Sequence, residues 1–441
     1  MRSPSFSRLS AILRAVLKWV RIRTLTLIFS IAGVLIFSLD LEKEYMLQNP
    51  EPSARTTLAS IADSVIWFHS FTRAGHRKPR AHFVRLITIA PDEEPNDVLT
   101  PGGYCAQRLF LSRLLLVLQT EGVGPVLIDK YFGERCPADA PETIALRNAI
   151  QQVSQSTPII IGLHANTSEE LAVRRKGKLS RDERHIFERA QLMLEPHNEV
   201  YEGPNVAYGL LTLDEGTNRI PASWEVFDPA TQQFRSLNTV SMLTAEAYDK
   251  SSSAKAQFSE FQHRAKTEDP YTNFVSASEF PTLSAIGVLC NGRPVVGSEW
   301  RQCEGGSFGQ QLLRNHVAVI GEYTDLDVHD SALGTVYGPL LQANYTESIL
   351  DDRYFWPVCR PLEFLIGLAW WGIVFLIVER SSSIFRAFLY SVGISAVLWV
   401  ALFDFAMQQW GVYMTIGAPG LMVFVGRLGD QGWRRIKGGE S

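Results

Sequence analysis

The chain has 441 residues, of which 46% are hydrophobic, and it carries 42 basic and 46 acidic side chains. That hydrophobic fraction, together with a formal net charge of only −4, excludes a globally disordered chain. The charge is spread unevenly: residues 1–39 carry +6, residues 362–426 carry −1 and residues 427–441 carry +2, which leaves −11 for residues 40–361. The acidic charge of residues 40–361 excludes a nucleic-acid-binding groove in that region, because phosphate binding needs a basic surface.

A first transmembrane helix is predicted over residues 24–39, which contain no charge. A bilayer core takes about 20 helical residues, and Arg21 and Arg23 can snorkel so that the helix begins a turn earlier. The alternatives are a buried core helix and the apolar part of a cleaved signal peptide. Because no small-x-small cleavage site follows Leu39, the favoured interpretation is an uncleaved anchor behind a basic cytoplasmic segment, residues 1–23.

Residues 40–361 are predicted to form an α/β domain with a largely parallel sheet flanked by helices. Apolar strand patterns occur at 83–90, 125–128, 158–163, 205–213 and 316–320. Helical patterns occur at 108–119, 141–155 and 280–288. Alternating strands and helices imply parallel strands with covering helices, and the β-branched run at 158–163 suits a strand buried on both faces. The charged segment 165–200 is predicted to be an exposed helical excursion.

An acidic segment follows the last predicted strand. The sequence TDLDVHD at 324–330 places four ionisable side chains in one loop, namely Asp325, Asp327, His329 and Asp330. Ligands of α/β sheets bind at the carboxyl ends of strands, and carboxylates with an imidazole suit a cation. A cation site is therefore one interpretation, and a solvated acidic loop is the favoured one. No G-x-S-x-G, P-loop, G-x-G-x-x-G or H-E-x-x-H motif occurs, so we predict neither catalysis nor a cofactor or metal ion.

The five cysteines all fall in the central region, at Cys105, Cys136, Cys290, Cys303 and Cys359. An oxidising compartment permits disulfides among them. Cys290 and Cys303 bracket a loop with glycine and proline and are the first predicted pair. Cys105 and Cys136 are the second, which leaves Cys359 single. Four cysteines allow three pairings, so spacing alone does not decide between them.

Three more membrane spans are predicted near the carboxyl end, at 362–378, 387–403 and 410–426. Three apolar stretches in tandem are hard to place in a soluble fold. The Lys/Arg bias of the flanks puts the N-terminus, the loop with Arg380 and Arg386, and the tail 427–441 in the cytoplasm. Residues 40–361 are then extracytoplasmic, and the protein is a multi-pass protein of a bacterial inner membrane, in contact with the lipid bilayer.

Four short segments stand out. They are a strand ending in Asp, a turn of the form Asp-x-Gly-x-x-Arg at 214–219, a strand–Gly–Asp segment and the stretch GPLLQAN at 338–344. Their polar residues are Asp129, Asp214, Arg219, Asp327, Asp330, Gln342 and Asn344. These segments resemble those of the second type of CHASE domain. The order of parts is also similar, with one span, an exported α/β domain and then three spans, so the resemblance covers roughly residues 24–427. That family comprises bacterial extracytoplasmic sensory domains. Gln342 stands where the family usually has His.

The resemblance implies that these seven polar residues contribute to ligand binding. In the family an output domain normally follows the last span, whereas here about fifteen residues follow residue 426, too few for a catalytic domain. We therefore expect a sensory module for an unknown small-molecule or peptide ligand that signals through an effector in trans, such as a kinase or a cyclase. One alternative is a structural or assembly protein of the cell envelope that docks another envelope protein. The other is a membrane-held, metal-dependent enzyme that uses the 324–330 segment.

Overall fold

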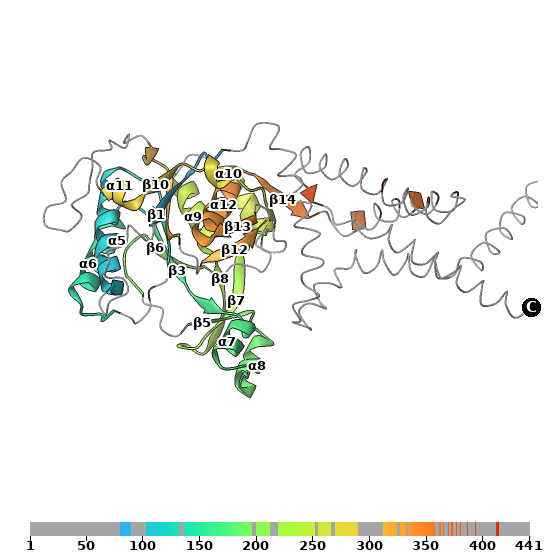
Figure 1. The fold of residues 1–441 in the computed structure, drawn as a ribbon, viewed down its shortest axis with the longest axis horizontal. Helices are drawn as coiled ribbons and strands as arrows, with labels where there is room; N and C mark the ends of the chain where they lie inside the picture. The colour runs from blue at the N-terminus through green and yellow to red at the C-terminus, as the bar shows by residue number, and fades with distance from the viewer. Residues whose placement is uncertain are drawn as a thin grey trace, which may run out of the picture. The chain divides into compact units, whose positions relative to one another are not determined.

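The computed structural model describes residues 80–89, 103–130, 132, 136–195, 200–211, 219–251, 255–265, 270–289, 312–323, 327–331 and 334–357, with isolated positions up to 413 (Figure 1). The chain divides into two compact units. One comprises Met1–Ala62 and Phe355–Ser441, and the other is Asp63–Tyr354. The second unit contains the α/β domain and nearly all of the described residues.

A six-stranded sheet forms the centre of the α/β domain. Its strands are β1 (Val84–Ile89), β2 (Val126–Asp129), β3 (Ile159–Leu163), β6 (Val206–Leu210), β10 (Thr282–Ser284) and β11 (Val317–Glu322). Their order is β10-β1-β11-β2-β3-β6, and every neighbouring pair is parallel. The predicted α/β class with a largely parallel sheet is confirmed.

Helices cover both faces of this sheet, as Figure 1 shows. One face carries α5 (Gly103–Thr120), α6 (Pro141–Val153) and α11 (Ala285–Leu289), and the other carries α9 (Val240–Ser251) and α12 (Gly338–Leu350). Successive strand residues point to opposite faces, so Ile159 and Ile161 pack under α5 and α6 while Ile160 packs with α9 and α12. Burial on both faces explains why these strands are apolar throughout.

A smaller sheet extends the domain beyond β3 and β6. It has the order β4-β5-β7-β8 and consists of β4 (Ala165–Asn166), β5 (Leu192–Leu194), β7 (Ser223–Asp228) and β8 (Gln233–Asn238). Two short helices, α7 (Ser168–Arg174) and α8 (Arg181–Phe187), lie between β4 and β5 in the chain. The predicted excursion at 165–200 is thus helical only in part, because its ends join this sheet.

The second unit also contains α10 (Lys255–Arg264), β9 (Tyr271–Thr272), the 3-10 helix η1 (Ala277–Glu279) and the antiparallel pair β12 (Val328–Ser331) and β13 (Gly334–Tyr337). β14 (Tyr354–Pro357), which begins at the last residue of this unit, pairs in parallel with β15 (Val412–Tyr413).

Two sequence-based assignments were wrong in part. Residues 280–288 were expected to be one helix, but Thr282–Ser284 pair with Leu86–Thr88 as the edge strand β10, and the helix begins only at Ala285. Residues 324–330 were expected to be a loop, but Val328–Ser331 form β12 against β13. In both cases strand pairing decides the short segment and local periodicity does not; the partner of β10 is distant in the chain, whereas the partner of β12 is the next strand.

Most of the predicted membrane segments lie outside the described residues. This holds for 24–39 entirely and for 362–378, 387–403 and 410–426 apart from isolated positions. Within the portion of the chain that the structure describes, no helix combines the length and apolar character needed to cross a bilayer.

Candidate functional site

The connections of the sheet diverge around β11. β1 and β2 lead into α5 and α6 on one face, whereas β11 leads through β12 and β13 into α12 on the other face. β11 lies between β1 and β2 in the sheet. Open α/β sheets bind their ligands outside the carboxyl ends of the strands at such a divergence. We therefore define the carboxyl edge as Asp129, Lys130, Glu322, Tyr323 and Asp327, together with the residues that hold them.

Asp129 ends β2 and is a strongly perturbed group of this edge. Its residue surface is half-buried, but the carboxylate oxygen Oδ2 is fully shielded and has no hydrogen-bond partner among the described residues. Burial, and after it the negative charges of Asp327 and Glu322, raises the pKa of Asp129 well above the ordinary range. A carboxyl group in this state keeps its proton more readily and offers both a donor and an acceptor to a ligand.

Lys130 ties together three elements at the same edge. Its Nζ donates hydrogen bonds to Glu322 Oε1, at the end of β11, and to Gln107 Oε1 in α5. The side chains of Lys130 and Glu322 are 23% and 27% exposed, so the ion pair is shielded yet still reachable from solvent. The edge therefore presents one cation beside one shielded acid.

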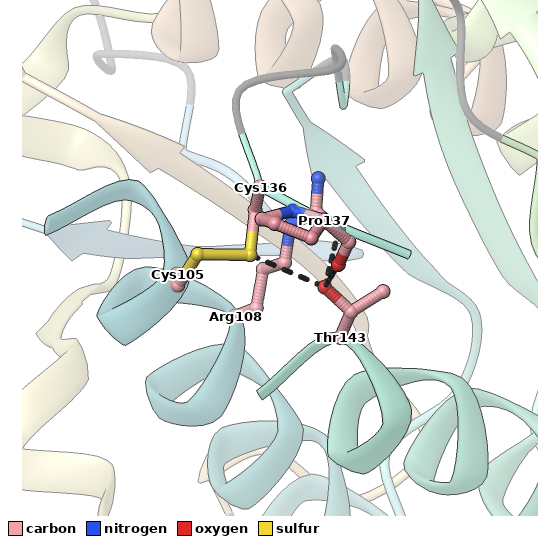
Figure 2. The surroundings of a disulfide bond; sticks show 5 residues. All are labelled: Cys105, Arg108, Cys136, Pro137 and Thr143. Carbon is pink, nitrogen blue, oxygen red and sulfur yellow. Dashed lines mark hydrogen bonds between the residues drawn. A yellow bond between two sulfur atoms is a disulfide. The ribbon is translucent and has the colours of Figure 1, made fainter. Parts of the chain in front are cut away.

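A disulfide fixes the segment that follows Lys130. Cys136 is bonded to Cys105 in α5, as Figure 2 shows. Thr143 Oγ1 lies 3.3 Å from Cys136 Sγ, accepts a 2.7 Å hydrogen bond from Arg108 Nη1 and donates a 2.8 Å hydrogen bond to the Pro137 carbonyl. The bridge thus links this segment to α5, which also carries Gln107. It joins the second of the two predicted pairs.

The other predicted pair, Cys290 and Cys303, lies outside the described residues, as does Cys359.

The acidic segment contacts the start of α12. Asp327 Oδ1 lies 2.9 Å from His329 Nε2, and the Asp327 carbonyl accepts a 3.0 Å hydrogen bond from the Gly338 N–H. A Cβ atom at Gly338 would fall 2.4 Å from Asp327 Oδ2, so only glycine lets this carboxylate approach the helix N-terminus. The partial positive charge of that terminus stabilises the carboxylate. Asp325 lies outside the described residues, and nothing is described of the Asp330 side chain beyond its place in β12.

Two tyrosines line the edge beside these acids. The rings of Tyr323 and Tyr337 have centroids 4.5 Å apart. Burial, followed by the neighbouring Tyr337 and Asp129, raises the pKa of Tyr323. The Tyr323 phenol therefore remains neutral around pH 7, and the two rings offer flat apolar faces with polar tips.

Gln342 and Asn344 do not belong to this edge. Gln342 Oε1 accepts a 2.7 Å hydrogen bond from Ser241 Oγ, and its Nε2 donates to the Leu211 carbonyl at 3.1 Å. Asn344 Oδ1 accepts from the Val275 N–H at 2.7 Å. Both side chains are buried, at 3% and 1% exposure, so their polar atoms hold α12 in the core.

Arg219 is also placed elsewhere. Its Nη2 donates a 3.0 Å hydrogen bond to the Tyr271 hydroxyl, and its guanidinium carbon lies 5.1 Å from the Tyr271 ring centroid. Asp214, its predicted companion, lies outside the described residues. Of the seven predicted ligand residues, the structure thus brings Asp129 and Asp327 to one edge.

Sequence reasoning missed Lys130, Glu322 and Gln107. Two of them had a usable signal, because Lys130 directly follows the strand that ends at Asp129, and Glu322 ends the strand paired with it. Gln107 had no such signal in the sequence, since its position near the start of a helix does not reveal its partner.

Comparison with known proteins adds no family to this geometry. The chain matches no protein-family model, no curated protein and no solved structure. The similarity to type-two CHASE domains therefore stays a prediction from the residues quoted above.

Proposed function

We propose that the α/β domain is an extracytoplasmic sensory module that binds a polar small molecule or peptide end at the carboxyl edge and signals through a partner protein. The spans 24–39, 362–378, 387–403 and 410–426 would hold it in a bacterial inner membrane with both termini in the cytoplasm. One observation carries the proposal. The shielded, unpartnered Oδ2 of Asp129 lies in the carboxyl edge with Lys130, where the sheet connections diverge.

The charges of the edge favour a ligand with both donors and acceptors. Asp129 is held towards its neutral form, and the Lys130 ammonium occupies the position between Glu322 and Gln107. A hard dication needs ionised carboxylates and is repelled by an ammonium. Among the described residues, no group of three His, Cys, Asp or Glu side chains is arranged to hold a metal ion. These charges favour a polar organic ligand over a metal ion at the carboxyl edge.

The helix α12 supplies a physical route for the signal. Asp327 contacts its first residue, and Glu347 near its other end accepts hydrogen bonds from the backbone N–H groups of His82, Phe83 and Val84 at 2.6–3.3 Å. Twelve of its thirteen residues are buried, so a displacement at one end would be passed along a closely packed helix. It ends at Leu350, and the predicted span begins at residue 362. A ligand that shifts Asp327 would bias the position of α12, provided that it binds the two arrangements with different affinity.

The Cys105–Cys136 disulfide supports the proposed compartment. Disulfides persist in secreted and periplasmic proteins and are rare in a reducing cytosol. Labelling of introduced cysteines in whole cells tests the topology directly. A cysteine at Arg235, which is exposed on β8, should react with a membrane-impermeant maleimide in intact cells, and protection until lysis would refute the exported orientation.

The ligand proposal is tested by thermal-shift screening of the full chain in detergent against amino acids, short peptides and sugars. A ligand at about 100 times its Kd should add about 2.7 kcal/mol to the free energy of unfolding. Asp129→Asn should abolish that gain, whereas Glu246→Gln, which alters only an exposed ion pair with Lys250, should retain it. A ligand that stabilises both variants equally would place its site elsewhere.

A further inference from the structure

The helical hairpin α7–α8 carries a positive charge that contrasts with the rest of the exported region. Residues 168–189, from the start of α7 to Arg189, contain seven Lys and Arg against five Asp and Glu, a net charge of +2. The remainder of 40–361 therefore carries −13. In Figure 1 the hairpin lies at the end of the domain occupied by the small sheet, away from α5 and α6.

Local hydrogen bonds define the hairpin, although each helix has only seven residues. Both helices begin with a complete capping box, Thr167 with Glu170 and Ser180 with Glu183. The turn between them folds back onto α7 through a 2.6 Å hydrogen bond from the Gly177 N–H to the Ala172 carbonyl. The basic side chains are therefore presented from a preformed surface.

Two nearby acids pair with arginines of the hairpin, and Asp182 in the first turn of α8 is exposed. Glu195 pairs with Arg174, and Glu183 lies 2.6 Å from Arg175 Nη1. Four further cations are exposed and have no ion-pair partner in the described part of the chain, and these are Lys176, Lys178, Arg181 and Arg184. We call these four residues the basic tip.

We propose that the basic tip is a docking surface for an acidic segment of a partner protein. Arginine forks suit carboxylates, and two arginines of this hairpin already pair with carboxylates. A lipid surface fits less well, because interfacial helices bury an apolar face with Trp, Phe or Leu. Among the described residues of α7 and α8, the exposed large hydrophobic side chain is Val173, and one such side chain does not make an apolar face. This surface is separate from the carboxyl edge, so it does not depend on the proposed ligand site.

The experiment measures binding of a fluorescent polyglutamate peptide to the full chain in nonionic detergent at low salt. The tip variant is Lys176→Gln, Lys178→Gln and Arg181→Gln. The control is Arg147→Gln, Lys250→Gln and Arg314→Gln, which removes the same charge at exposed positions elsewhere. An exposed pair contributes about 1.4- to 5-fold, so the tip variant should bind about 3- to 100-fold more weakly, and the control should bind as wild type does.

Three results would overturn the proposal. The first is no saturable binding to wild type, and the second is an equal loss in the control. The third is displacement of the peptide by empty phosphatidylglycerol nanodiscs but not by phosphatidylcholine nanodiscs, which would assign the tip to anionic lipid. Circular dichroism establishes that each variant is folded, and the single change Lys178→Gln replaces the triple variant if that one fails to fold.

Discussion

Removal of the Cys105–Cys136 bridge should destabilise the α/β domain by an amount set by the length of chain that it closes. The two cysteines are 31 residues apart. In the chain-entropy relation, a loop of that length corresponds to about 12 cal/mol/K, or about 3.7 kcal/mol at 25 °C. The unit Asp63–Tyr354 has about 290 residues and an unfolding entropy of about 0.6 kcal/mol/K. The double variant Cys105→Ala, Cys136→Ala should therefore melt about 6 °C below wild type.

Scanning calorimetry of the full chain without reductant measures this shift. Wild type treated with a dithiol reductant should melt with the double variant, because both lack the covalent link. Cys359→Ala is the control for loss of a thiol and should stay within about 1 °C of wild type. If the double variant melted with wild type, the bridge would not constrain the unfolded chain, and the reasoning would be refuted.

Three further changes probe the carboxyl edge and the core behind it. Because the pKa of Asp129 is raised in the native state, the free energy of unfolding of wild type should fall as pH rises from about 4 towards that pKa, by at most about 1.4 kcal/mol per pH unit. Asp129→Asn should flatten this slope in thermal melts from pH 4 to 8. Parallel curves for the two proteins would contradict the prediction. Gly321→Ala places a Cβ 2.1 Å from Pro339 Cγ and should lower the free energy of unfolding, measured with denaturant, by about 1–3 kcal/mol. An unchanged free energy of unfolding would mean that α12 lies further from β11 than this close approach requires. Gln342→Leu removes the side-chain amide that bonds the Ser241 hydroxyl and the Leu211 carbonyl, and it should lower the free energy of unfolding by about 1–3 kcal/mol without weakening ligand binding. A loss of binding without a loss of stability would show that Gln342 contacts the ligand.

The central sheet could be predicted because its strands are buried on both faces. Residues 159–163 are apolar without interruption, and only a strand in the middle of a parallel sheet needs that pattern at this length. Edge elements gave no comparable signal. Residues 282–284 have one exposed and one half-buried position, and their pairing with β1 lies almost 200 residues away in the chain. Periodicity cannot register a partner at that distance.

The candidate site divides in the same way. Asp129 could be placed at the edge because a strand pattern ends on it, and position at a strand end is a local property. The partners of Lys130 could not be predicted, because Glu322 lies 192 residues further along the chain and Gln107 lies 23 residues earlier. Their meeting depends on β11 entering the sheet between β1 and β2, which is a property of strand order.

The helix α12 shows why polar residues of a matching motif were assigned to a ligand. Its sequence GPLLQANYTESIL mixes apolar and polar residues around the helix and has no single apolar stripe, so periodicity does not reveal which polar residues are buried. In the structure this helix is buried almost completely, and its polar side chains bond to other elements: Gln342 to Ser241, Asn344 to Val275, and Glu347 to the start of β1. Each bond satisfies a group that would otherwise be costly to bury, so the polar residues specify one position for the helix. The same network connects the carboxyl edge to residue 350, so the proposed signalling route requires a ligand that favours a second arrangement of these bonds over the first.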